Sequence, residues 1–173
     1  DKSVRLSGGF ADSRVARSLH FVEGVDGDFG VVLRGLHLTD NLDDHVTAPS
    51  ASALIAGSSN ISISFWVYPE NAAPTFPNYD GFAGFRNNTD ADFYLLQLTA
   101  NNVEARFRNS SGTPFDIVFT GLILNAWQHF VMTYDGTTLT LYHNGVVAGT
   151  VAANGTIATS FETFYMGMTP WPG

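Results

Sequence analysis

The chain has 173 residues, 45% hydrophobic and only 14% charged, which suits one domain with a sizeable core and excludes an intrinsically disordered chain. Its net charge of −8 and its lack of a basic cluster argue against a nucleic-acid partner. It has no cysteines, which excludes disulfides and cysteine nucleophiles, and no apolar run of the roughly 18 residues that a membrane span needs.

The first half of the chain begins with glycine-interrupted segments and leads to one clear strand. We predict short strands at 4–6 and 36–38 and about one helical turn at 51–57. Residues 61–69, ISISFWVYP, alternate apolar and other side chains, which is typical of a strand with one face in a core. Proline ends that strand, because a central strand needs the N–H group that proline lacks.

Later strands are short and are separated by turn-forming segments such as NNTDAD and NSSGTP. The strands that we predict are 81–86, 93–99, 103–108, 115–120, 128–134, 138–143, 146–150 and 161–168. Asp135-Gly136 and Asn144-Gly145 are predicted to be type I′ hairpin turns, which need positive φ at both central residues. Many short strands at intervals of about 8–12 residues predict an all-β antiparallel sandwich.

The segment WQHFVMTYDGTTLTLYHNGVVAGT, residues 127–150, resembles the central meander of laminin-G-like, concanavalin A-type domains. Phe29-Gly30 and Asp43-Asp44-His45-Val46 resemble the family's first conserved segment. The resemblance covers roughly residues 29–173 and implies a two-sheet antiparallel jelly-roll β-sandwich. We expect a single domain over 1–173, in which 1–17 is a loosely assigned N-terminal segment.

The family pattern continues past a segment like 165–173 into a final strand that pairs beside the first one. This sequence stops before that strand, and an open sheet edge is a template for pairing. Three alternatives stay open: the sequence is a fragment, the N-terminal segment fills the gap, or another chain donates a strand. The hypothesis is that another chain or residues outside the sequence fill the edge.

No catalytic constellation is present in the sequence. Glucanases of this fold need two carboxylates two and four residues apart on one strand. The acidic pairs lie in turns instead: Asp26/Asp28, Asp43/Asp44 and Asp90/Asp92. The sequence also lacks Gly-x-Ser-x-Gly, a phosphate loop and His-Glu-x-x-His. We therefore predict that the domain is not an enzyme.

Calcium is the metal that the sequence favours, because it takes oxygen ligands from loops. The resemblance supports it, since many relatives bind calcium through loop carboxylates. The candidates are Asp40, Asp43 and Asp44, with Asp26 and Asp28 second. The alternative is that these turns use their carboxylates for local bonds to the backbone. The five histidines are dispersed and do not form a zinc pattern.

Sugar binding needs exposed aromatic faces beside polar groups. Strand parity turns five side chains away from the core, and we predict that they share one face, the concave surface of the jelly roll. They are Trp66, Tyr68, Arg106, His129 and Tyr142. The alternative is that loops cover these aromatic side chains as a second core layer.

Other aromatic residues are secondary candidates or are assigned a structural role. Phe76, Tyr79, Phe82 and Trp171 are candidate ligand contacts from loops. Trp127 is expected to anchor the entry into its strand instead of contacting a ligand.

Together these features predict a non-catalytic binding module that is extracellular or lies on a cell or virion surface. Its expected role is carbohydrate recognition or adhesion, with a glycan or other surface ligand as partner. The alternative is a structural or assembly subunit that forms homo- or hetero-oligomers through its open sheet edge.

Overall fold

The computed structural model describes residues 20–25, 32–37, 45–70, 80–158 and 162–168. The chain forms two compact units, 1–44 and 45–173. In the first unit, β1 (His20–Val25) pairs antiparallel with β2 (Val32–His37). The sequence did not predict β1, β2 overlaps the strand expected at 36–38, and the strand expected at 4–6 lies outside the described residues. The single domain over 1–173 stays a prediction.

The second unit contains ten described strands and one short helix. Four strands form one sheet: β4 (Ile61–Val67), β9 (Gln128–Tyr134), β10 (Thr138–His143) and β11 (Val146–Ala152). Six form the other: β3 (Val46–Ala48), β5 (Asp80–Phe85), β6 (Phe93–Gln97), β7 (Asn102–Arg108), β8 (Pro114–Thr120) and β12 (Phe164–Met166). The 3-10 helix η2 (Ala51–Leu54) falls within the predicted helical turn.

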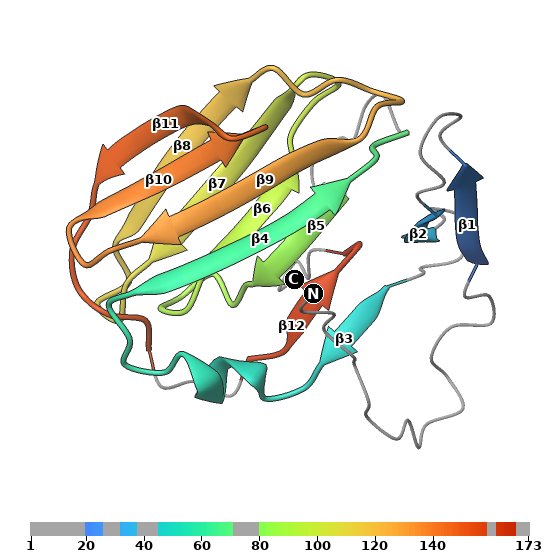
Figure 1. Cartoon of the computed structure of the whole chain (residues 1–173). Coiled ribbons are helices and arrows are strands. Elements are labelled where there is room, and N and C mark those ends of the chain that lie inside the picture. Colours follow the sequence, from blue (N-terminus) through green and yellow to red (C-terminus); the bar gives the residue numbers. More distant parts are fainter. Residues whose placement is uncertain (1–19, 26–31, 38–44, 71–79, 159–161, 169–173) are drawn as a thin grey trace. The chain divides into compact units, whose positions relative to one another are not determined.

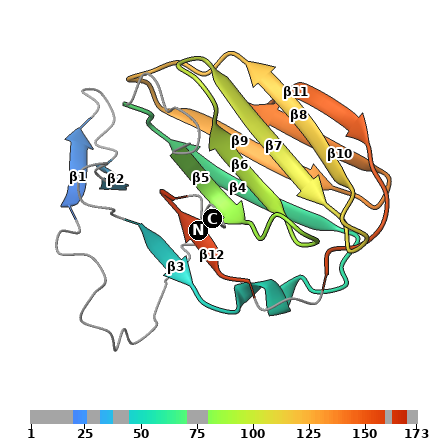
Figure 2. The ribbon, with the colours of Figure 1, turned by 180° about the vertical axis from the view of Figure 1, so that it is seen from behind.

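The two sheets of this unit form a β-sandwich. Their strand orders are β11-β10-β9-β4 and β3-β12-β5-β6-β7-β8, and all neighbours are antiparallel. Figure 1 shows the four-stranded sheet in front of β5 to β8, and Figure 2 shows the six-stranded sheet from behind. The predicted all-β, two-sheet antiparallel jelly-roll sandwich is confirmed.

The core lies between the sheets and follows from the alternation of side chains along the strands. Phe107 of β7 is fully buried, as are Phe130 and Met132 of β9. The ring of Tyr134 stacks on that of Phe107 with centroids 4.1 Å apart. Such aromatic pairs add about 0.5–1.5 kcal/mol to the free energy gained by burial alone. This contact joins the two sheets near the ends of β7 and β9.

The two predicted hairpin turns differ in the structure. Asn144 (φ 49°) and Gly145 (φ 80°) both have positive φ, which confirms the type I′ requirement. In the other turn, only Gly136 (φ 94°) of the predicted pair has positive φ, so the type I′ prediction centred on Asp135-Gly136 is wrong. The carboxylate of Asp135 instead accepts bonds from the backbone N–H groups of Thr137 (2.9 Å) and Thr138 (2.8 Å). This local bonding is the usual alternative for an Asp in a turn.

Candidate functional site

Two neighbouring aromatic pairs lie on the outer face of the four-stranded sheet, where side chains point away from the core. Trp66 of β4 is opposite His129 of β9, and their rings stack with centroids 5.0 Å apart. Just beyond the ends of the same strands, the rings of Tyr68 and Trp127 are 5.5 Å apart. The period of two along each strand places both pairs on one side of the sheet. We call these four residues the aromatic face.

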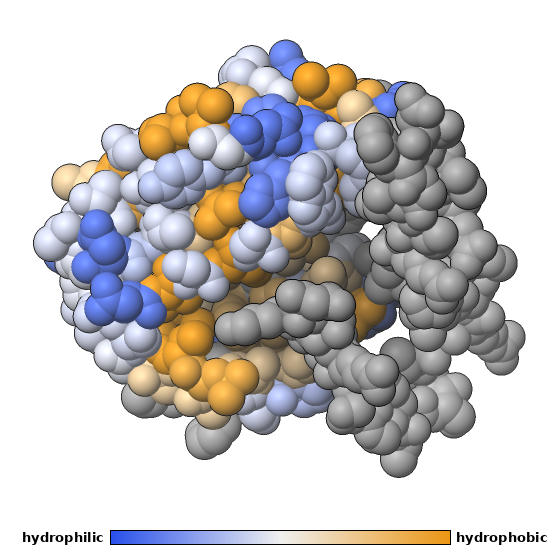
Figure 3. All heavy atoms as spheres, in the orientation of Figure 1, coloured by the Kyte–Doolittle hydropathy of each residue, from blue (hydrophilic) through white to orange (hydrophobic). Residues whose placement is uncertain are grey.

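The aromatic face is open to solvent. The exposed fractions are 64% for Trp66, 46% for Trp127 and 39% for Tyr68. Figure 3, seen from the side of the four-stranded sheet, shows hydrophobic side chains separated by pale and hydrophilic ones. A cluster of large exposed aromatic side chains indicates an interaction site more strongly than isolated ones do, because folded proteins bury most of their aromatic surface.

Polar groups border the aromatic face and hold His129 in position. The hydroxyl of Ser64 is 2.9 Å from Nε2 of His129. The backbone N–H of His129 donates to Oδ1 of Asn144 at 2.9 Å. Tyr142 of β10 lies opposite Val131, which is two residues after His129 on β9. Tyr142 is partly buried. Ring faces beside hydroxyl, imidazole and amide groups provide both stacking and hydrogen bonding to a ligand.

Arg106 does not share this face, so the predicted grouping of five residues is wrong in that respect. It belongs to β7 of the six-stranded sheet. Its Nε and Nη2 donate to the two carboxylate oxygens of Asp116 at 2.6 and 2.9 Å. Nη2 is also 3.6 Å from Glu104. Parity predicted correctly that Arg106 leaves the core, but parity alone does not say which sheet a strand joins.

The outer face of the six-stranded sheet is a region of paired charges. The hydroxyl of Tyr94 donates to Glu104 at 2.8 Å, and the guanidinium groups of Arg86 and Arg106 lie over its ring at 5.1 and 5.8 Å. Burial, together with the charge of Glu104, raises the pKa of Tyr94 far above its usual value. Tyr94 therefore stays a hydrogen-bond donor. No described strand carries two carboxylates, the arrangement that glucanases of this fold use.

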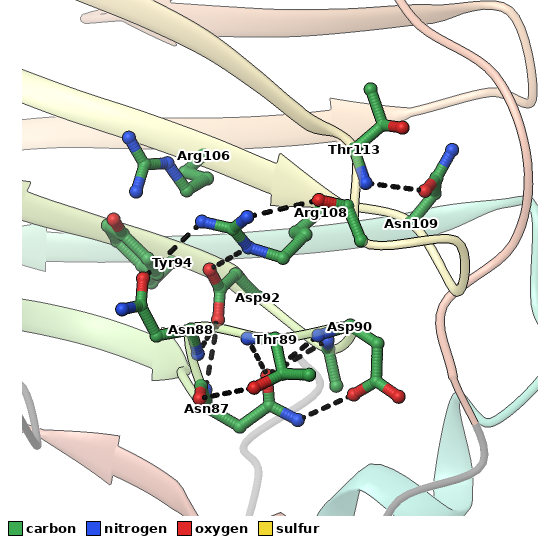
Figure 4. A network of polar contacts seen from close by, with 12 residues as sticks. Asn87, Asn88, Thr89, Asp90, Asp92, Tyr94, Arg106, Arg108, Asn109 and Thr113 are labelled. Carbon is green, nitrogen blue, oxygen red and sulfur yellow. Dashed lines mark hydrogen bonds and ion pairs between the residues drawn. The ribbon is translucent and has the colours of Figure 1, made fainter. Parts of the chain in front are cut away.

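A second polar cluster holds the connection between β5 and β6 (Figure 4). Asp92 is fully buried and accepts bonds from the backbone N–H groups of Asn87 (2.9 Å) and Asn88 (2.8 Å). Nε of Arg108 donates to its other oxygen at 2.8 Å. Asp90 accepts a 2.7 Å bond from the Asn87 amide. These contacts give both carboxylates structural partners, so the cluster explains the loop conformation and not a ligand site.

Several predicted residues lie where the structure does not describe them. Asp26, Asp28, Asp40, Asp43 and Asp44 lie outside the described residues, as do Phe76, Tyr79 and Trp171. Within the described part of the chain, no group of three or more His, Cys, Asp or Glu side chains is arranged to hold a metal ion. That part also has no helix with the length and hydrophobicity of a membrane span.

Two aromatic residues have roles that differ from the predictions. Phe82 is a residue of β5, packs against the core and stacks on Phe130 with ring centroids 6.3 Å apart. It is therefore not a loop candidate for ligand binding. Trp127, which we expected to be an anchor, is 46% exposed and adjoins Tyr68. The signal was present in the sequence, because Trp127 is two residues before His129 and so has the same parity.

The fold defines an all-β domain of the two-sheet antiparallel sandwich class. Residues 39–173 match a laminin G-type family described as the Concanavalin A-like lectin/glucanases superfamily, and the chain belongs to this family. Its name covers both lectins and glucanases. No curated protein matches the sequence.

Solved structures with the same fold include binding domains of botulinum neurotoxins and one domain of an arabinanase. The binding domain of botulinum neurotoxin DC, in complex with SialylT, is 20% identical, with a TM-score of 0.52 over 67% of this chain and 29% of that one. The botulinum neurotoxin type G receptor-binding domain is 18% identical, with a TM-score of 0.56 over 90% and 38%. Domain 4 of AbnA, an extracellular arabinanase from Geobacillus stearothermophilus solved with arabinotriose, is 21% identical, with a TM-score of 0.52 over 69% and 56%.

These identities are low enough that the likeness extends to the fold alone. The chain spans less than two thirds of each of these structures. It is a concanavalin A-like domain that resembles sugar-binding modules in fold.

Proposed function

We propose that the domain is a non-catalytic, extracellular module that binds carbohydrate through the aromatic face. The observation that carries this proposal is the pair of neighbouring exposed aromatic contacts, Trp66 with His129 and Tyr68 with Trp127. The C–H groups of a sugar ring pack on aromatic faces, while its hydroxyls need nearby donors and acceptors. Ser64, beside the first pair, supplies one of them.

The relatives in fold support the same role. The toxin binding domain was solved in complex with SialylT, and domain 4 of AbnA, an extracellular arabinanase, was solved in complex with arabinotriose. The carboxylates Glu104 and Asp116 both contact Arg106, which disfavours a role as glycosidase acid and nucleophile.

The test is binding of the purified chain to a panel of soluble glycans, followed by the Trp66→Ala variant. Trp66 is largely exposed, so its truncation leaves the core intact. A tryptophan at the centre of a binding site contributes about 2 kcal/mol, so affinity should fall at least about tenfold. Val118→Ala is the matched control, because Val118 is an exposed residue of β8 on the other sheet. Equal affinity of Trp66→Ala and the parent chain would refute this site.

Calcium remains a prediction that no step of this proposal requires. Repeating the panel with calcium and then with EDTA tests it. Loss of binding in EDTA would support carboxylate ligation by Asp40, Asp43 and Asp44. Binding that is equal in both conditions would make the domain calcium-independent.

A second candidate function, assembly through a sheet edge, is favoured by a separate observation on β4. Among the described strands, β4 has a neighbour only in β9. Its core-facing Ile63, Phe65 and Val67 are only partly buried, whereas the core-facing residues of β9 are fully buried. An added strand would bond to this edge of the described sheet and cover these side chains.

Native mass measured over a range of concentrations tests assembly independently of glycan binding. A fixed oligomer or an open series would support pairing along β4. A monomer at every concentration would count against assembly between copies of this chain.

A further inference from the structure

The sheet that carries the aromatic face has no charged strand residues. The sequences of β4, β9, β10 and β11 are ISISFWV, QHFVMTY, TLTLYH and VVAGTVA, without Asp, Glu, Lys or Arg. The nearest acidic residues along the chain, Glu70 and Asp135, lie beyond the strand ends. Asp135 is engaged by the N–H groups of its own turn. Stacking and neutral hydrogen bonds are therefore the interactions that these strands offer a ligand.

Charges gather on the opposite sheet, where they are paired with one another. Glu104, Arg106 and Asp116 form one group on β7 and β8, and Arg108 pairs with Asp92. The whole chain carries a net charge of −8, so its long-range field opposes an anionic ligand. An anionic glycan would gain no cationic partner from the strands of the four-stranded sheet and would be repelled by the chain as a whole.

The arrangement of the aromatic pairs indicates the length and direction of the ligand. The Trp66–His129 pair lies across β4 and β9, and the Tyr68–Trp127 pair is the next register step along both strands. Successive outward positions on a strand are roughly 6–7 Å apart. Two sugar units in sequence would therefore meet the two pairs in turn if the glycan follows the strand direction.

We propose that the ligand is an uncharged, linear oligosaccharide of at least two sugar units that lies along β4 and β9. This inference rests on the proposed carbohydrate-binding function and specifies its substrate class. The Trp66 ring is stacked on His129, whose imidazole bonds to Ser64. This part of the site is held in place before the ligand arrives, which limits the entropy lost on binding.

The experiment compares neutral with anionic glycans by titration calorimetry. The neutral probes are glucose, xylose and arabinose with their linear di- and trisaccharides. The anionic probes are sialylated trisaccharides and oligogalacturonates. Measurements run at about pH 8, where histidine side chains are ordinarily neutral. At least one neutral trisaccharide should bind at least about tenfold more tightly than its monosaccharide, a difference of about 1.4 kcal/mol. That affinity should change less than about twofold between low salt and about 0.5 M NaCl.

Trp127→Ala locates the second sugar unit. This variant should lower trisaccharide affinity at least about tenfold and monosaccharide affinity much less, whereas Val118→Ala should change neither. Preference for the anionic probes, strong weakening by salt, or equal affinity for mono- and trisaccharide would overturn the inference while leaving carbohydrate binding intact. If a folded sample, verified by circular dichroism, binds no probe of either class, the proposed function fails and the inference with it.

Discussion

Asp92 shows how one buried charge organises a loop. Its carboxylate is fully buried, yet two backbone N–H groups and the guanidinium of Arg108 surround it. Removing one member of a buried ion pair costs more than the pair contributes, because the remaining charge stays in a region of low polarity. The segment from Asn87 to Asp92 therefore depends on a carboxylate at this position.

The Asp92→Asn substitution should lower the free energy of unfolding by about 3 kcal/mol. The amide has a similar shape but no charge, so it leaves Arg108 without its counter-ion. Asp116→Asn is the matched control, because Asp116 pairs with Arg106 but its side chain is 35% exposed. That change should cost less than about 1 kcal/mol. Urea unfolding of both variants measures the difference, and equal losses would contradict the structural role given to Asp92.

Single residues of the candidate site could be predicted from strand parity only in part. Parity turned Trp66, His129 and Tyr142 away from the core, as the structure has them. Sequence does not state which strands are neighbours, so Arg106 was assigned to the wrong face. Trp127 shares the parity of His129 but precedes the predicted strand, and its contact with Tyr68 joins segments that are distant in the sequence.

At the scale of elements, alternation and turn chemistry predicted most strands of the sandwich. The bounds of β9 and β10 were predicted without error, because alternation is regular and turns flank both strands. β6 was predicted less accurately at its end. All five of its residues are buried, so the sequence shows no alternation of apolar and polar residues that could mark where the strand ends. The pairing of β12 between β3 and β5 joins distant segments and has no local signal.

Gly84 is the residue on which the pairing of β5 with β6 depends. Its φ is +143°, and a Cβ atom there would collide with the backbone of Phe93 and Tyr94. Because backbone is less able to move than a side-chain tip, Gly84→Ala should destabilise the fold by about 3 kcal/mol or more.

Gly57→Ala is the control for Gly84→Ala, since Gly57 also has positive φ (+71°) but has open space at the Cβ position. It should cost only about 1–2 kcal/mol from backbone strain. Thermal unfolding followed by circular dichroism compares the two variants. A Gly84→Ala domain as stable as Gly57→Ala would mean that β5 and β6 separate more easily than the structure indicates.

At the scale of the whole second unit, the two outer faces of the sandwich have different chemistry. The strands of one sheet are uncharged and carry exposed aromatic rings, while the other sheet carries paired charges around the buried Tyr94. The sequence predicted the sandwich. It did not predict this division, because segregation of charge between two sheets depends on the strand order, which is a property of long-range pairing.

His143 should make the stability of the sandwich depend on pH. Its ring faces inward, stacks on Phe130 with centroids 4.9 Å apart, and places Nε2 2.9 Å from the side-chain oxygen of Gln128. That oxygen also accepts the N–H of Ile123, so the imidazole acts as the donor. Burial lowers the pKa of His143 below its ordinary value of 6.5, and the folded state therefore favours the neutral ring.

The direction of the pH effect follows from proton linkage. Below about pH 6.5 the unfolded chain binds a proton at His143 that the folded chain resists, so this residue should lower stability as the pH falls from about 7.5 to 5. The melting temperature should fall less over this range in His143→Gln, whose amide can still donate to Gln128. All other titrating groups are the same in both proteins, so they affect the two pH profiles alike. Parallel profiles would show that the folded chain accommodates a protonated His143 without cost.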